Sequence, residues 1–207
     1  MKLLKAFLIG SALIAPAAAN AAVVGAQGQI NAPFATLSSA GLNGGSLATL
    51  TGGSIYTSDQ SFADIPEGVF GGTFLAAGPR AGQPATLTFT QAVSAFGFLI
   101  GSPDSYNQLT ITSTAGIFNF TPATLGLSTT GDQTLSQYVN FATTVAGETI
   151  TSVSFTNNPA IDAFETANFA VAGAVPEPAT WGMMILGFGV IGGVMRRRSV
   201  NTSVRFA

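Results

Sequence analysis

The side chains of this chain that could take part in chemistry are mainly carboxylates, hydroxyls and amides, because the sequence contains no histidine and no cysteine. This inventory excludes a Ser-His-Asp triad, a cysteine nucleophile, a zinc site of the usual kind and a haem axial ligand. The chemistry that remains uses oxygen atoms, as in calcium coordination or carboxylate acid–base catalysis. The absence of cysteine also means that packing and hydrogen bonding must stabilise the fold without disulfides.

One candidate site lies where the last predicted strand of the body begins. Asp162, Glu165 and Asn168 occur within eight residues there. In a regular strand Glu165 shares a face with apolar side chains, which is costly for a carboxylate unless it is paired or binds a metal ion. Calcium takes oxygen ligands of these types, so we predict a calcium site at these three residues, with Asp104 as a further candidate ligand. The alternative is that Glu165 lies in water at a bulge or a sheet edge.

Two other segments carry polar groups. Asp59, Asp64 and Glu67 place three carboxylates in one loop, and a glycosidase needs two carboxyl groups at a set separation. Any acidic surface loop has the same composition, so this enzyme hypothesis is a minor alternative. Residues 101–107 contain Pro103 flanked by polar residues, which is typical of a tight turn and secondarily of a binding loop.

These candidates must be positioned by β-strands. Short segments of the body alternate apolar residues with threonine or serine and are separated by Gly, Asn, Asp and Pro, and no segment shows a sustained helical period. We predict strands near residues 47–50, 69–75, 86–90, 93–100, 109–112, 117–121, 135–141, 153–156 and 164–171, and a loose stretch over 26–53. The fold class is therefore all-β, an antiparallel β-sandwich of jelly-roll type over residues 22–174, filled by phenylalanines. Threonine-rich strands leave ice binding as a further alternative, although no fixed Thr-x-Thr ladder is present.

The charge of this body excludes several partners. Arg80 is its one basic residue, against eight carboxylates, so its net charge is about −7. The eight acidic residues are Asp59, Asp64, Glu67, Asp104, Asp132, Glu148, Asp162 and Glu165. Binding to nucleic acid or to an anionic membrane surface needs Lys and Arg. We therefore expect no nucleic-acid partner.

The N-terminus has the pattern of a secretory signal. Lys2 and Lys5 precede an apolar stretch over 6–15, and the small residues Ala19 and Ala21 suit signal peptidase. We predict that residues 1–21 are a signal peptide cleaved after Ala21.

The C-terminus combines a rigid motif, an apolar helix and a basic stop. Residues 179–195 contain one polar residue and span roughly 25 Å as a helix, near the lower limit for a bilayer. This predicts a transmembrane helix with its basic tail in the cytoplasm and the body outside. The residues that carry the pattern are Pro176, Glu177, Pro178, Trp181, Arg196, Arg197 and Arg198.

This ordered combination over 175–207 resembles a PEP-CTERM sorting domain of the PEPxxWA variant, with Gly182 where the variant usually has Ala. The resemblance implies a Gram-negative bacterium, export, temporary membrane anchoring, processing by an exosortase and delivery to the cell surface or the extracellular matrix. An ordinary permanent anchor is the alternative.

Taken together, the sequence predicts a protein that is not an enzyme and that has a structural or adhesive role in a biofilm or exopolysaccharide. A calcium-assisted, lectin-like carbohydrate-binding module is the alternative from another class. No cofactor is expected, with calcium as the exception discussed above.

Overall fold

A computed structural model describes residues 22–173 and 184–192 of the chain. Residues 1–21, including Ala19 and Ala21, lie outside the described residues. So do the residues of the predicted sorting motif, which are Pro176, Glu177, Pro178, Trp181, Arg196, Arg197 and Arg198. The predicted division of the chain at these ends stays a prediction.

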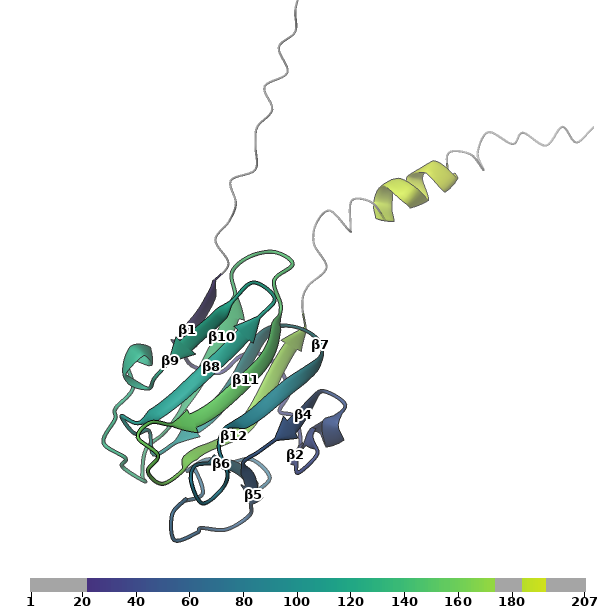
Figure 1. The fold of residues 1–207 in the computed structure, drawn as a ribbon. Helices are drawn as coiled ribbons and strands as arrows, with labels where there is room; N and C mark the ends of the chain where they lie inside the picture. The colour runs from purple at the N-terminus through teal and green to yellow at the C-terminus, as the bar shows by residue number, and fades with distance from the viewer. Residues whose placement is uncertain (1–21, 174–183, 193–207) are drawn as a thin grey trace, which may run out of the picture.

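The body is built from strands joined by short loops, with two 3-10 turns, η1 (Asn43–Gly45) and η2 (Ala123–Leu125) (Figure 1). All strand pairs are antiparallel. The strands are β1 (Val23–Gln27), β2 (Leu37–Ser38), β3 (Gly41–Leu42), β4 (Ala48–Thr51), β5 (Ser54–Tyr56), β6 (Phe74–Ala77), β7 (Ala85–Gly101), β8 (Asn107–Ser113), β9 (Ile117–Phe120), β10 (Ser136–Thr143), β11 (Ile150–Asn157) and β12 (Phe164–Gly173).

The strand β7 belongs to both layers of the fold. Its first half pairs with β4 and β11, which places it in the layer β2-β3-β4-β7-β11-β8-β9. Its second half pairs with β10 and β12, in the layer β1-β10-β7-β12-β6-β5. Between Thr88 and Val93 the register with β11 shifts, so β7 bends there as it passes from one layer to the other. We call this bend the corner of β7.

The two layers also meet at other places. Gly52 and Gly53 connect β4 in one layer to β5 in the other, and both have the positive φ that such a tight turn requires (69° and 67°). At the opposite edge, Gln27 Nε2 donates hydrogen bonds to the carbonyls of Leu125 and Gly126, both at 3.0 Å. The result is a continuous antiparallel sheet that is folded on itself and nearly closed.

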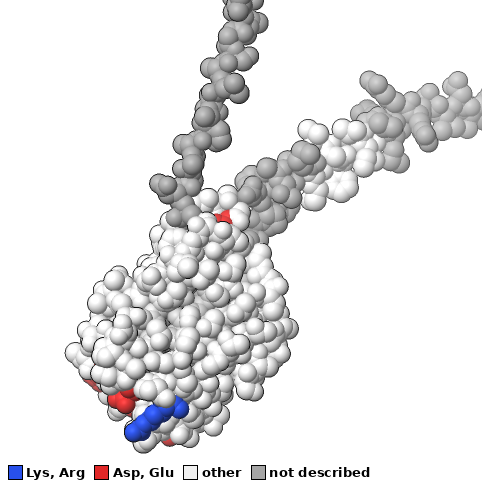
Figure 2. All heavy atoms as spheres, viewed as in Figure 1, with Lys and Arg blue, Asp and Glu red and all other residues white. Residues whose placement is uncertain are grey.

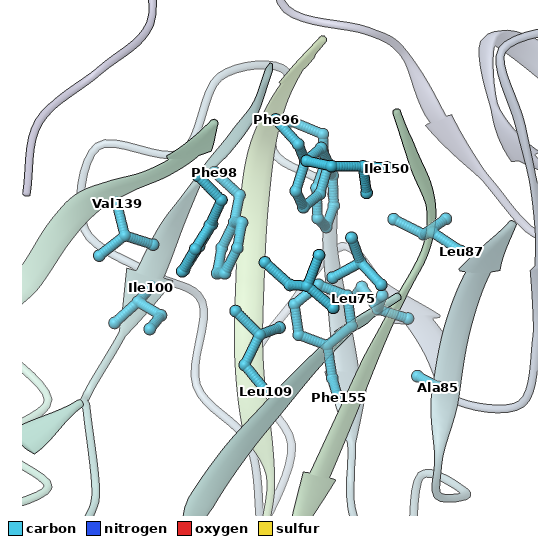
Figure 3. Close-up of a cluster of buried hydrophobic side chains, with 14 of the residues drawn as sticks. Leu75, Ala85, Leu87, Phe96, Phe98, Ile100, Leu109, Val139, Ile150 and Phe155 are labelled. Carbon is cyan, nitrogen blue, oxygen red and sulfur yellow. The ribbon is translucent and has the colours of Figure 1, made fainter. Parts of the chain in front are cut away.

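The core between the layers consists largely of phenylalanine rings. Phe98 on β7 contacts Phe155 on β11 edge to face, with 5.2 Å between ring centroids, and Phe141 on β10 lies 6.0 Å from Phe98. Phe155 in turn contacts Phe164 and Phe169 on β12. Figure 3 shows Phe98 and Phe155, together with Leu75, Leu109 and Val139, pointing toward one another between the strands.

The body has two distinct ends. At one end β1 begins and β12 finishes, close to the corner of β7, where the Ser94 hydroxyl donates to the Gly173 carbonyl at 2.6 Å. Residues 22 and 173, the first and last described residues of the body, therefore both lie at this end (Figure 1). At the other end β7 finishes at Gly101 and β12 begins at Phe164.

The structure confirms the predicted all-β class and its antiparallel pairing, whereas the jelly-roll connectivity stays a prediction. The segments 86–90 and 93–100 form one strand, β7. The predicted strand at 69–75 starts only at Phe74, because Gly71 and Gly72 take positive φ values and interrupt extended backbone. The stretch 26–53 is more ordered than predicted. Within it β2, β3 and β4 pair in sequence order as an antiparallel meander, and β4 joins this meander to β7.

Of the predicted transmembrane helix over 179–195, the structure describes residues 184–192, which are helical. Among the residues that the structure describes, no helix combines the length and apolarity needed to cross a membrane.

The position of Phe98 predicts a large loss of stability when its ring is removed. The residue is 1% exposed and lies among four other rings, so Phe98→Ala should lower the free energy of unfolding by about 3–5 kcal/mol. Phe70→Ala is the matched control, because Phe70 is 70% exposed and should cost less than about 1 kcal/mol. Urea denaturation measures both, and equal losses would contradict this account of the core.

Candidate functional site

A polar pocket of about 460 Å³ opens at the end of the body away from the termini. Four separate segments line it, and each contributes at least one hydrogen-bonding side chain. The lining residues are Gln60, Ser61, Phe62, Asp64, Ser102, Asp104, Tyr106, Thr130, Gly131, Gln133, Asp162, Ala163 and Glu165. Asp64, Asp104, Asp162 and Glu165 therefore bring four carboxyl groups to one cavity.

Two buried asparagines hold the loops of the pocket in place. Asn107 and Asn157 are 1% and 3% exposed, and Asn107 Nδ2 donates to Asn157 Oδ1 at 3.0 Å. Asn107 Oδ1 accepts the backbone N–H of Asp104 at 2.7 Å. Asn157 Nδ2 donates to the carbonyls of Ile161 and Asp162 at 2.9 and 3.0 Å. Because unpaired amides are costly inside a protein, this network fixes both loops relative to the sheet.

Glu165 is the most deeply buried acid of the pocket. It is 4% exposed, and its Oε2 accepts a hydrogen bond from the Ser102 hydroxyl at 3.1 Å. Burial disfavours the ionised carboxylate and raises the pKa of Glu165 to about 8. At neutral pH the side chain is therefore mainly a protonated acid that can donate a hydrogen bond.

Tyr106 and Asp104 form a second hydrogen-bonded pair. The Tyr106 hydroxyl donates to Asp104 Oδ2 at 2.6 Å. Burial, followed by this hydrogen bond and the nearby carboxylates, raises the pKa of Tyr106 well above its usual value, so the phenol stays protonated. Gly131 packs against the Asp104 carboxylate so closely that a Cβ atom there would lie 2.5 Å from Oδ1.

The rim adds amide and aromatic groups. Gln133 Nε2 donates a hydrogen bond to Asp64 Oδ2. Phe62 lies at the rim with the Arg80 guanidinium 5.5 Å from its ring centroid, and Arg80 also donates to the Ser61 hydroxyl at 3.3 Å. Arg80 is the one basic residue among those described and does not line the cavity. In Figure 2 the basic atoms and most of the visible acidic atoms lie at the end of the body away from the grey terminal segments.

Two residues that line the pocket have strained backbone. Ser102 and Asp162 have φ values of 35° and 34°, in the left-handed region that residues with side chains seldom adopt. The asparagine network described above holds the carbonyl of Asp162 in this position. Strain of this kind persists only where surrounding contacts enforce it, and it clusters at functional sites.

The structure brings together two of the three residues of the predicted calcium site. Asp162 and Glu165 line the pocket, whereas Asn168 lies elsewhere: its Nδ2 donates to the Gly68 carbonyl at 3.0 Å and to the Tyr138 hydroxyl at 2.7 Å. Asn168 lies at an irregularity of β12, where its φ is 52° and the register with β7 shifts, and its amide is bound to Gly68 and Tyr138, so the three predicted ligands do not meet in one site. Asp104, named as a further ligand, does line the same cavity.

Within residues 22–173 and 184–192, no three acidic side chains are arranged to hold a metal ion. Of the acidic loop, Asp64 lines the pocket, Asp59 accepts the backbone N–H of Ile65 at 2.8 Å, and Glu67 is exposed. The three carboxylates of the glycosidase hypothesis therefore do not form one site.

Sequence reasoning missed the contribution of residues 130–133. It joined Asp104 of segment 101–107 to segment 162–168, but it placed the acidic loop 59–67 with neither. Residues 130–133 reach the pocket through an isolated bridge between Thr130 and Asp104. These two residues are distant in the sequence, so no local pattern predicts their contact.

Comparison with known proteins identifies the C-terminal segment. Residues 174–199 match the family model of the PEP-CTERM protein-sorting motif. The chain thus carries the sorting segment predicted from its sequence, which marks an exported protein sorted by an exosortase. No curated protein and no solved structure matches the chain.

Glu165 predicts an unusual pH dependence of stability. Its carboxyl has a pKa of about 8 when folded and about 4.3 when unfolded, so between these values the folded state binds the extra proton. Its contribution to stability therefore falls as pH rises through this window, by about 1.4 kcal/mol per pH unit. Glu165→Gln should remove this contribution and make the variant more stable than the wild type at pH 8.

Urea midpoints of the two proteins at pH 5 and pH 8 measure this effect. Glu67→Gln is the control, because Glu67 is exposed and its loss should leave the pH profile unchanged. A wild type and a Glu165→Gln variant with parallel pH profiles would contradict the assigned protonation state.

Proposed function

We propose that this chain is a structural or adhesive component of the cell surface, biofilm or exopolysaccharide of a Gram-negative bacterium, delivered there by exosortase processing. The observation that carries the proposal is the sorting motif at residues 174–199. Signal peptidase is the proposed partner at the N-terminus, exosortase acts on the tail, and the C-terminal helix anchors the chain in the membrane until processing.

The arrangement of the last strand supports processing without damage to the body. β12 finishes at Gly173, where its backbone pairs with Val93, and the sorting motif begins at the next residue. Every strand of the body therefore lies N-terminal to the motif. A cut near Pro176 removes the tail and leaves all the strand pairs of β12 intact.

The position of the pocket suits a protein held by its C-terminus. The tail leaves from the end of β12, and the pocket lies where β12 begins, with Glu165 near its first residue. Ten residues of strand span about 33 Å. A body attached at residue 174 would therefore present the pocket on the side away from its attachment.

A second candidate function is carbohydrate binding at this pocket. Its lining offers carboxylate, amide and hydroxyl groups beside the rings of Phe62 and Tyr106, which is the combination that hydroxyl-rich ligands require. Exopolysaccharide at the cell surface is the proposed ligand class. We propose that binding is direct and non-catalytic, through hydrogen bonds from the side chains that line the pocket.

The sorting proposal predicts the mass of the mature protein. Protein recovered from the surface or medium of the producing bacterium should begin at Ala22 and end near Pro176, because both terminal segments are removed. Intact-mass spectrometry checks this, with a strain lacking exosortase as the control. In that strain the tail with Arg196, Arg197 and Arg198 should remain, and its retention in the normal strain would contradict the proposal.

The carbohydrate proposal predicts that Asp104→Asn weakens binding. A charged acceptor of sugar hydroxyls is lost without a change in volume, so affinity for the bacterium's purified exopolysaccharide should fall about tenfold or more. Isothermal titration measures this, with the exposed Glu67→Gln as the matched control. EDTA should leave the affinity unchanged, whereas loss of binding in EDTA would show that calcium is required. Equal binding by Asp104→Asn, or none by the wild type, would contradict the pocket's role.

A further inference from the structure

We infer that removal of the predicted signal peptide creates an ion pair between the new α-ammonium group of Ala22 and the buried carboxylate of Glu148. The inference rests on the predicted cleavage after Ala21. It assigns to the mature N-terminus a binding site in the body, and to the cleavage a role in stabilising the fold.

Glu148 is a buried acid that the candidate pocket does not use. It lies 5% exposed in the loop between β10 and β11, at the end of the body where the termini leave. Its Oε1 accepts a hydrogen bond from the Ser113 hydroxyl at 2.5 Å, and its Oε2 accepts the backbone N–H of Ala22 at 3.3 Å. The nitrogen that cleavage would liberate is therefore already in contact with a carboxylate oxygen.

The charge of this carboxylate has no other partner nearby among the described residues. Arg80, their one basic residue, contacts Ser61 and Phe62 at the pocket end. The segments that surround Glu148 and Ala22 (92–94, 113–116 and 143–147) contain no ionisable side chain. A carboxylate buried without a compensating charge is costly, whereas a buried pair with good hydrogen bonds offsets that cost.

The backbone of Ala22 is held in place for this contact. Its carbonyl accepts hydrogen bonds from the N–H and the hydroxyl of Thr144, at 3.0 and 3.1 Å. The next residue, Val23, is 6% exposed and pairs with Thr143 at the start of β1. The position of the Ala22 nitrogen is thus fixed by the same ladder that adds β1 to the sheet.

Cleavage changes the chemistry of that nitrogen. Hydrolysis breaks the C–N bond between Ala21 and Ala22; water supplies the oxygen of the new Ala21 carboxylate, and its two protons convert the amide nitrogen into an ammonium group. The neutral amide had one N–H to donate, whereas the ammonium has three and carries a positive charge. A charge-assisted hydrogen bond is roughly twice as strong as a neutral one. The precursor therefore holds β1 at this position less strongly than the processed chain.

An amine-reactivity experiment tests the pair, because both lysines, Lys2 and Lys5, lie in the predicted signal peptide. The processed chain then has a single amine, the α-amino group of Ala22. An ion pair that raises its pKa by about one unit lowers the reactive neutral fraction about tenfold. The processed full chain should therefore react with an acetylating ester about tenfold more slowly than its Glu148→Gln variant at pH 7.5.

The matched control is Glu67→Gln, an exposed acid whose loss should leave the acetylation rate unchanged. The wild type alone gives a second readout: its rate should rise with pH around an apparent pKa above the ordinary 7.7–8.0 of an α-amino group. Acetylation should also lower the melting midpoint at pH 7 by about 2–4 °C. This difference should disappear as pH rises through the amine pKa, since the charged form is then lost.

The outcomes separate the inference from the proposal of export. Intact mass first establishes where the processed chain begins. A chain that begins at Ala22 and reacts at the ordinary rate, with an ordinary amine pKa, would overturn the ion pair and leave export untouched. A chain that begins at another residue would overturn both the cleavage position and the inference built on it.

Discussion

The fold depends on the backbone pairing of β7, because no other strand in the described part of the chain takes part in both layers. A strand has two edges, and β7 uses both of them twice: β4 and β11 pair with its first half, and β10 and β12 with its second. Its inward side chains, among them Leu87, Phe96 and Phe98, therefore supply core to both layers. In a chain without disulfides this continuity replaces a covalent link between the layers.

Local pattern was enough to predict which residues pack inward but not how the strands connect. Alternation in segments such as 109–112 and 153–156 identified β8 and β11, because each has one buried face. The same alternation predicted two strands, 86–90 and 93–100, where the structure has only β7. A bend within one strand and a loop between two strands both place polar residues in solvent, so the sequence pattern is the same for both. Asp162 and Glu165, the two acids singled out from the sequence, line one pocket, and the side chains of Asp64 and Gln133 that join them there come from segments far away in sequence.

The pocket illustrates why such neighbours escape prediction. Its loops are positioned by the amides of Asn107 and Asn157, which lie 50 residues apart and are buried between the layers. In a sequence, these asparagines cannot be told from the many that lie in surface turns. Their role follows from burial, because a buried amide must satisfy its donors and acceptors within the protein. The strained Asp162 is held by the same network, through the hydrogen bond from Asn157 to its carbonyl.

The positions of the two predicted processing sites and of the pocket follow from one feature of the topology. β1 begins and β12 ends at the corner of β7, so both terminal segments join the body where the layers are already connected. Cleavage there would remove no strand of the body, and Glu148, the one acid that the described residues place at that end, lies against the nitrogen of Ala22. The carboxyl groups of the pocket, in contrast, lie at the opposite end of β12 and β7. Export and maturation can therefore act on one end of the sheet while the other keeps the geometry of its binding groups.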